Sequence, residues 1–229
     1  MAEEAKETHK WPPLESNPEI FNEYLAKIGA DTSWGYAEIF GLDEELLMMV
    51  PQPAVAVVAA IDRVNKDDGK PGAGCDSTVV PFYMKQTGDL DNACGIIAMI
   101  HAALNNLDQM TIPSGSILDR FIDGTRDITP DERSEFLQGF NDFKVAHQES
   151  ASQGSSEVPD VGKTEYHFIA FVRGPNGELV ECDGTKDGPS VIAESCDDVL
   201  KGAVNEIRRR LEGGFISERL NLMALCKQQ

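Results

Sequence analysis

The stretch from Gln86 to Cys94 carries residue types suited to nucleophilic chemistry. Cys94 opens the apolar, helix-forming run CGIIAMIHAALNN, and Asn92 just before it is a good N-cap residue. A thiol in the first turn of a helix feels the positive end of the helix dipole, which favours the thiolate that attacks carbonyl groups. The side-chain amide of Gln86 can donate a hydrogen bond to an oxyanion formed at that sulfur. The spacing therefore predicts a cysteine nucleophile with an oxyanion donor upstream.

A cysteine nucleophile needs a general base, and the chain offers four histidines. His101 lies seven residues along the same helix, about 10 Å up its axis, and so out of hydrogen-bond reach of Cys94. His9 belongs to the N-terminal tail, and His147 lies on a polar segment typical of a surface histidine. His167 begins an apolar, β-rich run, where a histidine is more often a core residue than a catalyst.

The sequence after His167 favours a catalytic role for this histidine over a role in the core alone. The runs YHFIAFV and ELVECD are separated by RGPNG, which predicts a β-hairpin. Folding back there sets His167 opposite residue 183 or 184, within about two positions, and neighbouring strands lie ~4.8 Å apart. Asp183 can then reach one imidazole nitrogen and orient the other, in the Cys–His–Asp order of a papain-type thiol hydrolase. A slip of one residue in the pairing would turn Asp183 to the other face of the sheet. The pair Asp183-Gly184 is equally consistent with a plain turn, and Cys94 is equally consistent with a small buried apolar residue.

Composition indicates one globular domain with an acidic surface. The 229 residues are enough for one substantial core, and their 41% apolar and 7% aromatic content is ordinary for a folded protein. The 20 basic and 39 acidic residues give a net charge of −19. Such a surface repels nucleic acid and anionic membranes and steers toward basic proteins, although solubility alone explains it equally well.

The cysteines and the N-terminal segment favour a reduced, cytoplasmic protein. Five cysteines, an odd number with no CxxC pair, argue against a disulfide framework and against a clustered zinc site. The start MAEEAKETHK is not a signal peptide, and the longest apolar run, 54–61, is too short to cross a bilayer. We therefore expect a cytoplasmic monomer that needs no metal and no organic cofactor.

Helix and strand patterns alternate along the chain. Helical patterns cover 17–28, 43–50, the run from Cys94, 114–126, 129–140, 142–148 and 196–211. Strand patterns cover 36–40, 54–61, 79–84, the two hairpin runs and 219–226. Strands interleaved with helices, with at least one antiparallel hairpin, predict an α/β (α+β) fold in which a mixed sheet carries helices packed against it.

Two segments are predicted to be loops. The stretch 62–77 is polar and rich in Gly, Lys and Asp. Residues 150–164, SASQGSSEVPDVGKT, show no hydrophobic periodicity, and unstructured loops of this length are often functional. Because this second loop lies in sequence between the Cys94 helix and the His167 strand, we expect it to span the cleft between them and limit the size of a leaving group.

On these residues, the chain resembles the small ubiquitin C-terminal hydrolases, which are cysteine deubiquitinases of papain-like fold. The resemblance runs nearly end to end, through WPPLESNPEIFNEYLAKIG, LDEELLMMVPQPAVAVV, MKQT…NACGIIAMIHAALNN, SGSILDRFID, TPDERSEFL, EYHFIAFV, LVECDGTKDGP and LNLMALCK. It implies a single domain over 1–229 and a papain-like fold, with a central, mostly antiparallel sheet flanked by helices. It also implies a deeply knotted chain, with a crossover loop at about 150–164.

The resemblance also implies a role for each candidate residue. Cys94 matches the nucleophile, His167 the general base and acid, Asp183 the residue that orients the histidine, and Gln86 the oxyanion-hole donor. Positions that contact ubiquitin in the family match Leu14, Glu15, Asn17, Gly154 and Glu157, and also the stretch 213–217.

One spacing departs from the family pattern. There the glutamine stands six residues before the cysteine, whereas Gln86 precedes Cys94 by eight, as though two residues were inserted within 88–91. The longer loop either bulges outward and leaves Gln86 in place, or displaces it.

The resemblance implies thiol-dependent hydrolysis of the bond after the C-terminal glycine of ubiquitin, with release of small adducts or of short or unfolded extensions. The implied partner is ubiquitin or a close relative of it. A ubiquitin-binding or sequestering protein with weak turnover is the alternative, favoured if the longer segment before Cys94 disarms the oxyanion hole. A third class, a papain-like amidase or acyltransferase acting on small molecules, is supported neither by the net charge nor by any cofactor motif.

Overall fold

The computed structural model describes residues 10–64, 77–155 and 166–228. The elements before the candidate nucleophile are α1 (Pro18–Lys27), β1 (Trp34–Glu38), α2 (Glu44–Leu47), β2 (Ala54–Arg63) and the short 3-10 helix η1 (Ser77–Val79). The helical part follows, with α3 (Cys94–Leu104), α4 (Ile117–Thr125), α5 (Pro130–Gly139) and α6 (Asn141–Ala151). The last elements are β3 (Tyr166–Arg173), β4 (Leu179–Cys182), β5 (Ser190–Ala193), α7 (Val199–Glu212) and β6 (Ile216–Lys227).

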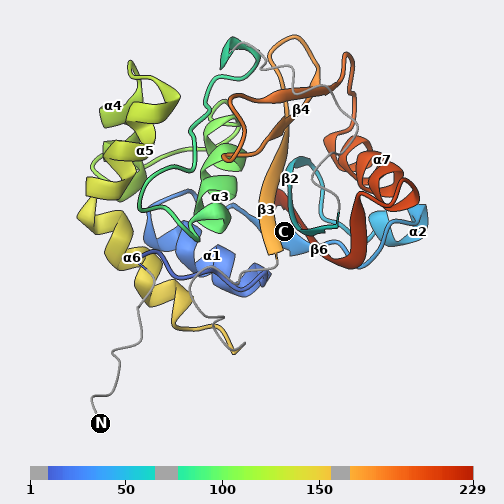
Figure 1. Ribbon diagram of the computed structural model, residues 1–229, viewed down its shortest axis with the longest axis horizontal. Coiled ribbons are helices and arrows are strands. Elements are labelled where there is room, and N and C mark those ends of the chain that lie inside the picture. Colours follow the sequence, from blue (N-terminus) through green and yellow to red (C-terminus); the bar gives the residue numbers. More distant parts are fainter. Residues whose placement is uncertain (1–9, 65–76, 156–165, 229) are drawn as a thin grey trace.

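In the described part of the chain the strands form one six-stranded sheet in the order β1-β6-β2-β3-β4-β5 (Figure 1). Every neighbouring pair is antiparallel. In the central strand β2, Ala59 pairs with Ile169 of β3 on one side and with Leu222 of β6 on the other. The prediction of a mostly antiparallel sheet flanked by helices is confirmed, and the apolar run 54–61 lies within its central strand. The mixed sheet predicted from the alternation of strands and helices is wrong, because all strand pairs in the described residues are antiparallel.

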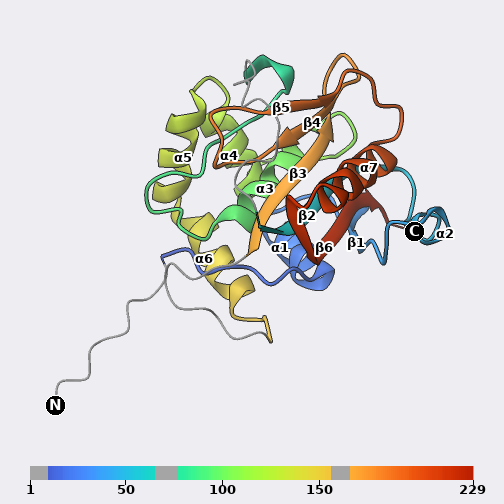
Figure 2. The same cartoon turned by 45° about the vertical axis from the view of Figure 1, so that its right-hand side comes forward.

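Alternate side chains of β2 contribute to two different cores. Val58 and Ala60 belong to the core formed with α1, α3, α4 and α6, whereas Val57 and Ala59 belong to the core under α7. Figures 1 and 2 show α7 on one side of the sheet and α3 with α1 on the other. A strand that is buried on both faces is apolar at every position, which explains why the sequence shows a continuous apolar run there.

Two helices begin as their sequences predict. Asn17 caps α1, because its Oδ1 accepts the backbone N–H of Glu19 at 2.9 Å, and Pro18 stands at the first helical position. Thr129 and Glu132 form a capping box at the start of α5, in which each side chain accepts from the other residue's backbone. These caps set the ends of the helices that surround α3.

The β-rich segment 79–84 is not a strand, so that prediction is wrong. The backbone N–H of Phe82 donates to Oδ1 of Asn105 at 2.8 Å, and that of Met84 donates to Nε2 of His101 at 3.0 Å. His101 lies within α3, and Asn105 is the residue that caps its C-terminal end. Because they satisfy backbone groups that a neighbouring strand would otherwise bind, the segment lies against α3 without joining the sheet.

Other element boundaries also differ from the prediction. Helix α6 is longer than predicted, so Ser150 and Ala151 of the predicted loop are its last residues. The short edge strand β5 has no counterpart among the predicted strands. Residues 65–76 and 156–165, which include most of both predicted loops, lie outside the described residues.

Candidate active site

Cys94 is the first residue of α3, as predicted. The N-cap residue is Ala93 and not Asn92, because the preceding turn already gives Ala93 near-helical backbone angles (φ −79°, ψ 8°). Helix α3 is buried along its whole length, and Cys94 is 6% exposed. A Cβ at position 95 would lie 3.3 Å from the side chain of Leu14, so Leu14 covers the helix next to the thiol.

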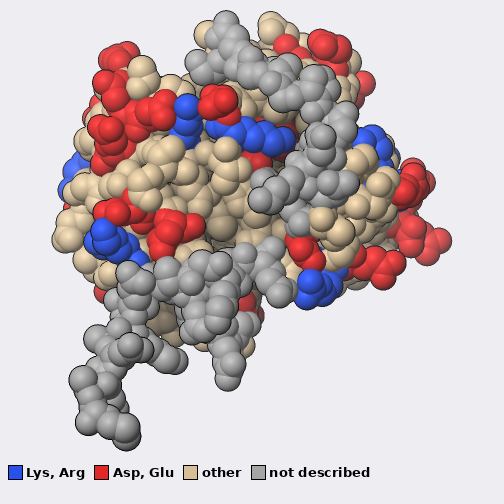
Figure 3. All heavy atoms as spheres, in the orientation of Figure 1, with Lys and Arg blue, Asp and Glu red and all other residues tan. Residues whose placement is uncertain are grey.

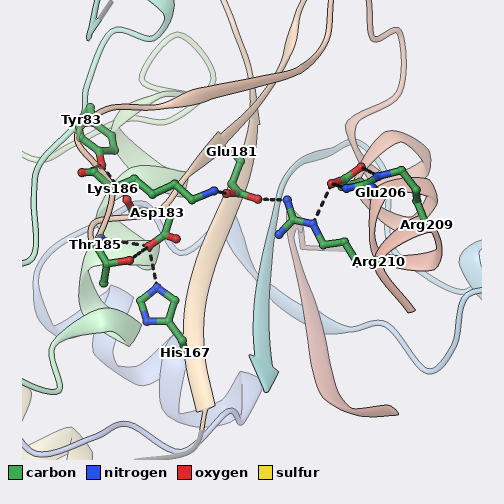
Figure 4. Close-up of polar contacts among 9 residues, drawn as sticks. All are labelled: Tyr83, His167, Glu181, Asp183, Thr185, Lys186, Glu206, Arg209 and Arg210. Carbon is green, nitrogen blue, oxygen red and sulfur yellow. Dashed lines mark hydrogen bonds and ion pairs between the residues drawn. The ribbon is translucent and has the colours of Figure 1, made fainter. Parts of the chain in front are cut away.

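The hairpin brings His167 and Asp183 together. Ala170 of β3 pairs with Cys182 of β4, so the same register continued would set Asp183 opposite Ile169, two residues from His167. Two residues apart in a strand is the spacing of diagonal neighbours on one face. Nε2 of His167 lies 2.7 Å from Oδ1 of Asp183. Figure 4 shows the two side chains pointing toward each other.

The carboxylate of Asp183 is buried and accepts several hydrogen bonds. Besides His167, Oδ1 accepts the backbone N–H of Thr185 at 3.0 Å and its hydroxyl at 2.8 Å. Because a backbone N–H can only donate, Oδ1 acts as an acceptor and Nε2 of His167 carries the proton between them. Nδ1 is then the ring nitrogen that remains for Cys94.

The electrostatics of His167 depend on both neighbours. Burial of the ring by itself lowers the pKa of His167, but its hydrogen bonds with Asp183 and Cys94 and the charges of both residues outweigh burial. The net result is a pKa raised to about 9. The imidazole therefore holds its proton more tightly than an ordinary histidine does, because it lies against both Asp183 and Cys94.

The backbone of Gln86 lies against the turn that follows Asp183. Its N–H donates to the carbonyl oxygen of Gly184 at 2.7 Å. A Cβ at position 184 would lie 3.1 Å from the side chain of Ile97 and 3.2 Å from Gln86, so this close approach favours glycine. The structure thus brings all four predicted catalytic residues into one region.

The side chain of Gln86 is turned toward the segment before Cys94. Nε2 donates to the carbonyl oxygens of Leu90 at 3.0 Å and of Asp91 at 3.1 Å. Two carbonyl oxygens can accept only from the NH2 end of an amide, so these partners fix which way the amide points. The predicted oxyanion donor therefore already has two acceptors within the protein.

The longer segment before Cys94 is an ordered turn. Gln138 of α5 accepts the backbone N–H of Asp89 at 3.0 Å and donates to the carbonyl oxygen of Thr87 at 3.3 Å. Lys10 pairs with the carboxylate of Asp89 at 2.8 Å, and Leu90 is buried. The backbone of Gln86 lies at the site, and its side-chain amide is held by this turn.

Among the residues predicted to contact ubiquitin, those of the N-terminal segment and those after α6 lie side by side. Oε2 of Glu15 accepts the backbone N–H of Ser155 at 2.9 Å, and a Cβ at Gly154 would lie 3.2 Å from the same oxygen. The N-terminal segment and the residues after α6 therefore meet beside Leu14. Asn17 caps α1, and Glu157 lies outside the described residues.

The prediction of His147 as a surface histidine is wrong. Its side chain is buried in α6, with Nε2 at 2.7 Å from the carbonyl oxygen of Pro12 and its ring 5.0 Å from that of Trp11. Burial lowers its pKa to about 4. Its neighbours in sequence are polar because α6 has an exposed side, whereas the aromatic partner comes from the far end of the chain.

Some residues of the site were missed by sequence reasoning. Thr185 stands two residues after Asp183, and an Asp whose side chain binds a backbone N–H two residues on is a recognisable turn signal. Tyr83 donates from its hydroxyl to the turn that holds Asp183, and no local pattern predicted it. Among the described residues no group of three or more His, Cys, Asp or Glu is placed to hold a metal ion. No helix within the described ranges is long and apolar enough to span a membrane.

Comparisons with known proteins agree with this geometry. Residues 11–212 match the family model described as ubiquitin carboxyl-terminal hydrolase, family 1. The chain is 35% identical over 238 aligned positions to ubiquitin carboxyl-terminal hydrolase 3 of Arabidopsis thaliana, covering 99% of this chain and 98% of the relative. It is 34% identical over 222 aligned positions to ubiquitin carboxyl-terminal hydrolase isozyme L1 of Rattus norvegicus, covering 94% and 97%.

A solved structure shares the fold. The UCH37 catalytic domain of Trichinella spiralis, bound to ubiquitin vinyl methyl ester, superposes with a TM-score of 0.76 at 24% identity. The match covers 95% of this chain and 96% of that one. The sheet and helices described above are therefore the papain-like arrangement of that domain.

Proposed function

The chain belongs to the ubiquitin carboxyl-terminal hydrolase family, and on that basis we propose that Cys94, His167 and Asp183 are its catalytic triad. Members of this family are cysteine-type deubiquitinating hydrolases, and so is this chain. The observation that carries the assignment of residues is the position of His167, which is hydrogen-bonded to Asp183 and lies close enough to Cys94 for that thiol to raise the pKa of the ring.

In the first step, the Cys94 sulfur attacks the carbonyl carbon of the C-terminal glycine of ubiquitin. The carbonyl oxygen becomes an oxyanion and needs donors placed where its charge develops. The first backbone N–H groups of α3 have no partner within the helix, so the N–H of Cys94 is one such donor. Gln86 is the second donor in this proposal.

His167 moves the proton in both halves of the reaction. As an imidazolium it protonates the leaving nitrogen, so the bond after the glycine breaks and a thioester on Cys94 remains. The neutral imidazole then takes a proton from water, which attacks the thioester and releases ubiquitin. Asp183 keeps Nε2 of the ring occupied, so that Nδ1 performs these transfers.

The role of Gln86 requires a change of hydrogen-bond partners. To reach the oxyanion, its Nε2 has to leave the carbonyl oxygens of Leu90 and Asp91. Some of the energy of the new bond is then spent on breaking the old ones. A ubiquitin-sequestering protein with weak turnover is favoured by the same observation, since an amide that stayed on the turn would leave the oxyanion short of a donor.

The remaining parts of the proposal concern partners and location. We infer that ubiquitin binds across Leu14, Glu15 and Gly154, which lie together beside the thiol. The protein is proposed to act as a cytoplasmic monomer, to need no cofactor, and to release small adducts in preference to folded leaving groups.

Two measurements on one preparation separate hydrolase from sequestering protein. Turnover of a fluorogenic C-terminal amide of ubiquitin is compared with calorimetric affinity for free ubiquitin, in the wild type and in Cys94→Ala. We expect rapid turnover by the wild type, none by Cys94→Ala, and equal affinities. Tight binding with negligible wild-type turnover would establish the sequestering alternative, and turnover by Cys94→Ala would refute the nucleophile.

A further inference from the structure

The carboxylate that orients His167 is carried by a tight turn, Asp183–Lys186. The backbone N–H of Lys186 donates to the carbonyl oxygen of Asp183 at 2.9 Å and closes the turn. Within it, Thr185 gives both of its donors to Oδ1 of Asp183. Because the carboxylate is bonded inside the turn, its position relative to His167 depends on where the whole turn sits.

A buried tyrosine contacts both ends of this turn. The hydroxyl oxygen of Tyr83 lies 2.7 Å from the carbonyl oxygen of Asp183 and 2.8 Å from that of Lys186. Its ring stacks on the buried ring of His101 in α3, with centroids 5.1 Å apart and an interplanar angle of 4°. Burial, and then the charge of Asp183, raise the pKa of Tyr83 far above its ordinary value, so the hydroxyl keeps the proton that it donates.

The side chain of Lys186 ties the same turn to the opposite layer of the fold. Its Nζ lies 2.7 Å from Oε1 of Glu181, and the other oxygen of Glu181 is paired with Arg210 of α7. Nε of Arg210 in turn donates to Glu206 at 2.8 Å. Figure 4 shows this line of charges running from α7 to the turn beside His167.

These charges are buried, and the proposed reaction uses none of them. Glu181 is 1% exposed and Arg210 3%, while the side chain of Lys186 is 29% exposed. A buried ion pair is weak evidence for stability, because desolvation of its charges offsets their attraction. A buried ion pair does fix the local geometry, because each charged group can reach its partner from only a few positions.

We propose that Tyr83 and Lys186 are positioning residues, which hold the turn Asp183–Lys186 so that the Asp183 carboxylate stays bonded to His167. Glu181 and Arg210 serve as the anchor for Lys186. The proposal rests on the proposed function only for its kinetic consequence, because the geometry of His167 can be measured without any substrate.

The two central variants are Lys186→Met and Tyr83→Phe, which keep most of each side chain's bulk and remove the polar group. Lys186→Met leaves Glu181 paired with Arg210, so the fold should survive. The pKa of His167 is measured by NMR titration of its ring in the free protein, with His167→Gln to assign the signal. Asp183 and Cys94 are the charged groups that act most on this ring.

Charge and positioning predict opposite results for Lys186→Met. Removing a nearby cation can only raise the pKa of a histidine or leave it unchanged, whereas loss of the bond to Asp183 lowers it. We expect the pKa of His167 to fall in both variants and to return toward the wild-type value in Lys186→Arg. Lys201 is an exposed lysine of α7, so Lys201→Met is the matched control and should leave the pKa of His167 unchanged.

Kinetics give the second readout. We expect kcat for a ubiquitin C-terminal amide to fall by about tenfold to 10²-fold in Lys186→Met and Tyr83→Phe, with little change in KM. Adding Lys186→Met to Asp183→Asn should cost nothing further, because the residue acts through Asp183. An unchanged pKa of His167 in both folded variants, or losses that multiply with Asp183→Asn, would overturn the proposal. A wild-type protein without turnover would refute the proposed function and leave the NMR result to decide the positioning roles.

Discussion

The two sides of the candidate site are organised differently. On the strand side, Asp183 accepts from His167 and twice from Thr185, and His167 also contacts Cys94. On the helix side, Gln86 donates its amide to Leu90 and Asp91 and not toward the thiol. The residues proposed to transfer protons are therefore in place before substrate arrives, whereas the proposed oxyanion donor has to exchange hydrogen-bond partners.

The difference follows from what each side packs against. The His167–Asp183 pair lies at the end of a β-hairpin that belongs to the central sheet. The turn that holds Gln86 is a surface segment, attached to α5 through Gln138 and to the N-terminal segment through an exposed ion pair of Lys10. Exposed ion pairs contribute little stability, so the pair of Lys10 and Asp89 adds little to the attachment of this turn, which is also held by the buried side chain of Leu90.

The largest expected effect tests whether the strand side acts as a unit. His167→Ala should lower kcat/KM by several orders of magnitude, because both proton transfers are lost, and Asp183→Asn should lower it by less. The double variant should be scarcely worse than His167→Ala. Steady-state kinetics on the fluorogenic amide measure all three, and fully multiplicative losses would mean that the two residues work independently.

The second effect tests the helix side. If Gln86 reaches the oxyanion, Gln86→Ala should reduce kcat by about 10²–10³ and leave ubiquitin affinity unchanged. A loss below about threefold would show that the amide stays on the turn during catalysis. In that case deleting two residues of the segment 88–91 should raise kcat, because the amide would lose its internal acceptors.

A third effect concerns the pH dependence of kcat/KM, which depends on the pKa of His167 and so on the geometry of the strand side. The pKa of His167 is raised to about 9 from an ordinary value of about 6.5. The proton is held more tightly in the folded state, so its contribution to stability is complete below about pH 6.5 and is lost as the pH rises through about 9. The acid that protonates the leaving nitrogen is lost over the same range.

We therefore expect the alkaline limb of kcat/KM near pH 9 in the wild type and at lower pH in Asp183→Asn, since Asp183 is one of the groups that raise the pKa of His167. The limb is read from kcat/KM of the fluorogenic amide across the pH range. An alkaline limb that does not move in Asp183→Asn would mean that the titrating group is not His167.

The smallest expected effect concerns encounter with the partner. The chain has a net charge of −19, and Figure 3 shows acidic side chains gathered over α4 and α5 and again beside α2. If the complementary face of ubiquitin is basic, kon should fall as salt rises from low to physiological concentration, and koff should change less. Stopped-flow association measures this, and a rate independent of salt would leave the acidic surface as a solubility feature.

Sequence reasoning predicted which candidate residues would lie together, because their signals are local. Cys94 opens an apolar helical run, and the turn signal after Arg173 aligns His167 with Asp183 to within the width of one diagonal pair. The start of α3 at Cys94 was predicted correctly, but its cap was predicted one residue early: Asn92 has cap chemistry, whereas the backbone of the preceding turn makes Ala93 the cap.

What the sequence did not indicate depends on contacts between distant segments. Tyr83 and Asp183 are 100 residues apart, and nothing near either of them predicts their hydrogen bond. The β-rich segment 79–84 was expected to be a strand, but side chains of α3 accept its backbone N–H groups. His147 was predicted to be exposed because its partner Trp11 lies near the N-terminus, far from it in sequence.

The reactive cysteine can be identified with ubiquitin that carries a C-terminal electrophile, such as the vinyl methyl ester. Burial raises the pKa of Cys182, of Cys196 and of Cys226, the last to about 11, so these thiols are poor nucleophiles at neutral pH. Cys75 lies outside the described residues and has no part in the proposed site. We expect a single adduct, mapped by peptide mass spectrometry to Cys94 and absent in Cys94→Ala. An adduct on any other cysteine, or a wild-type protein that binds the probe without reacting, would contradict the assignment of Cys94 as the nucleophile.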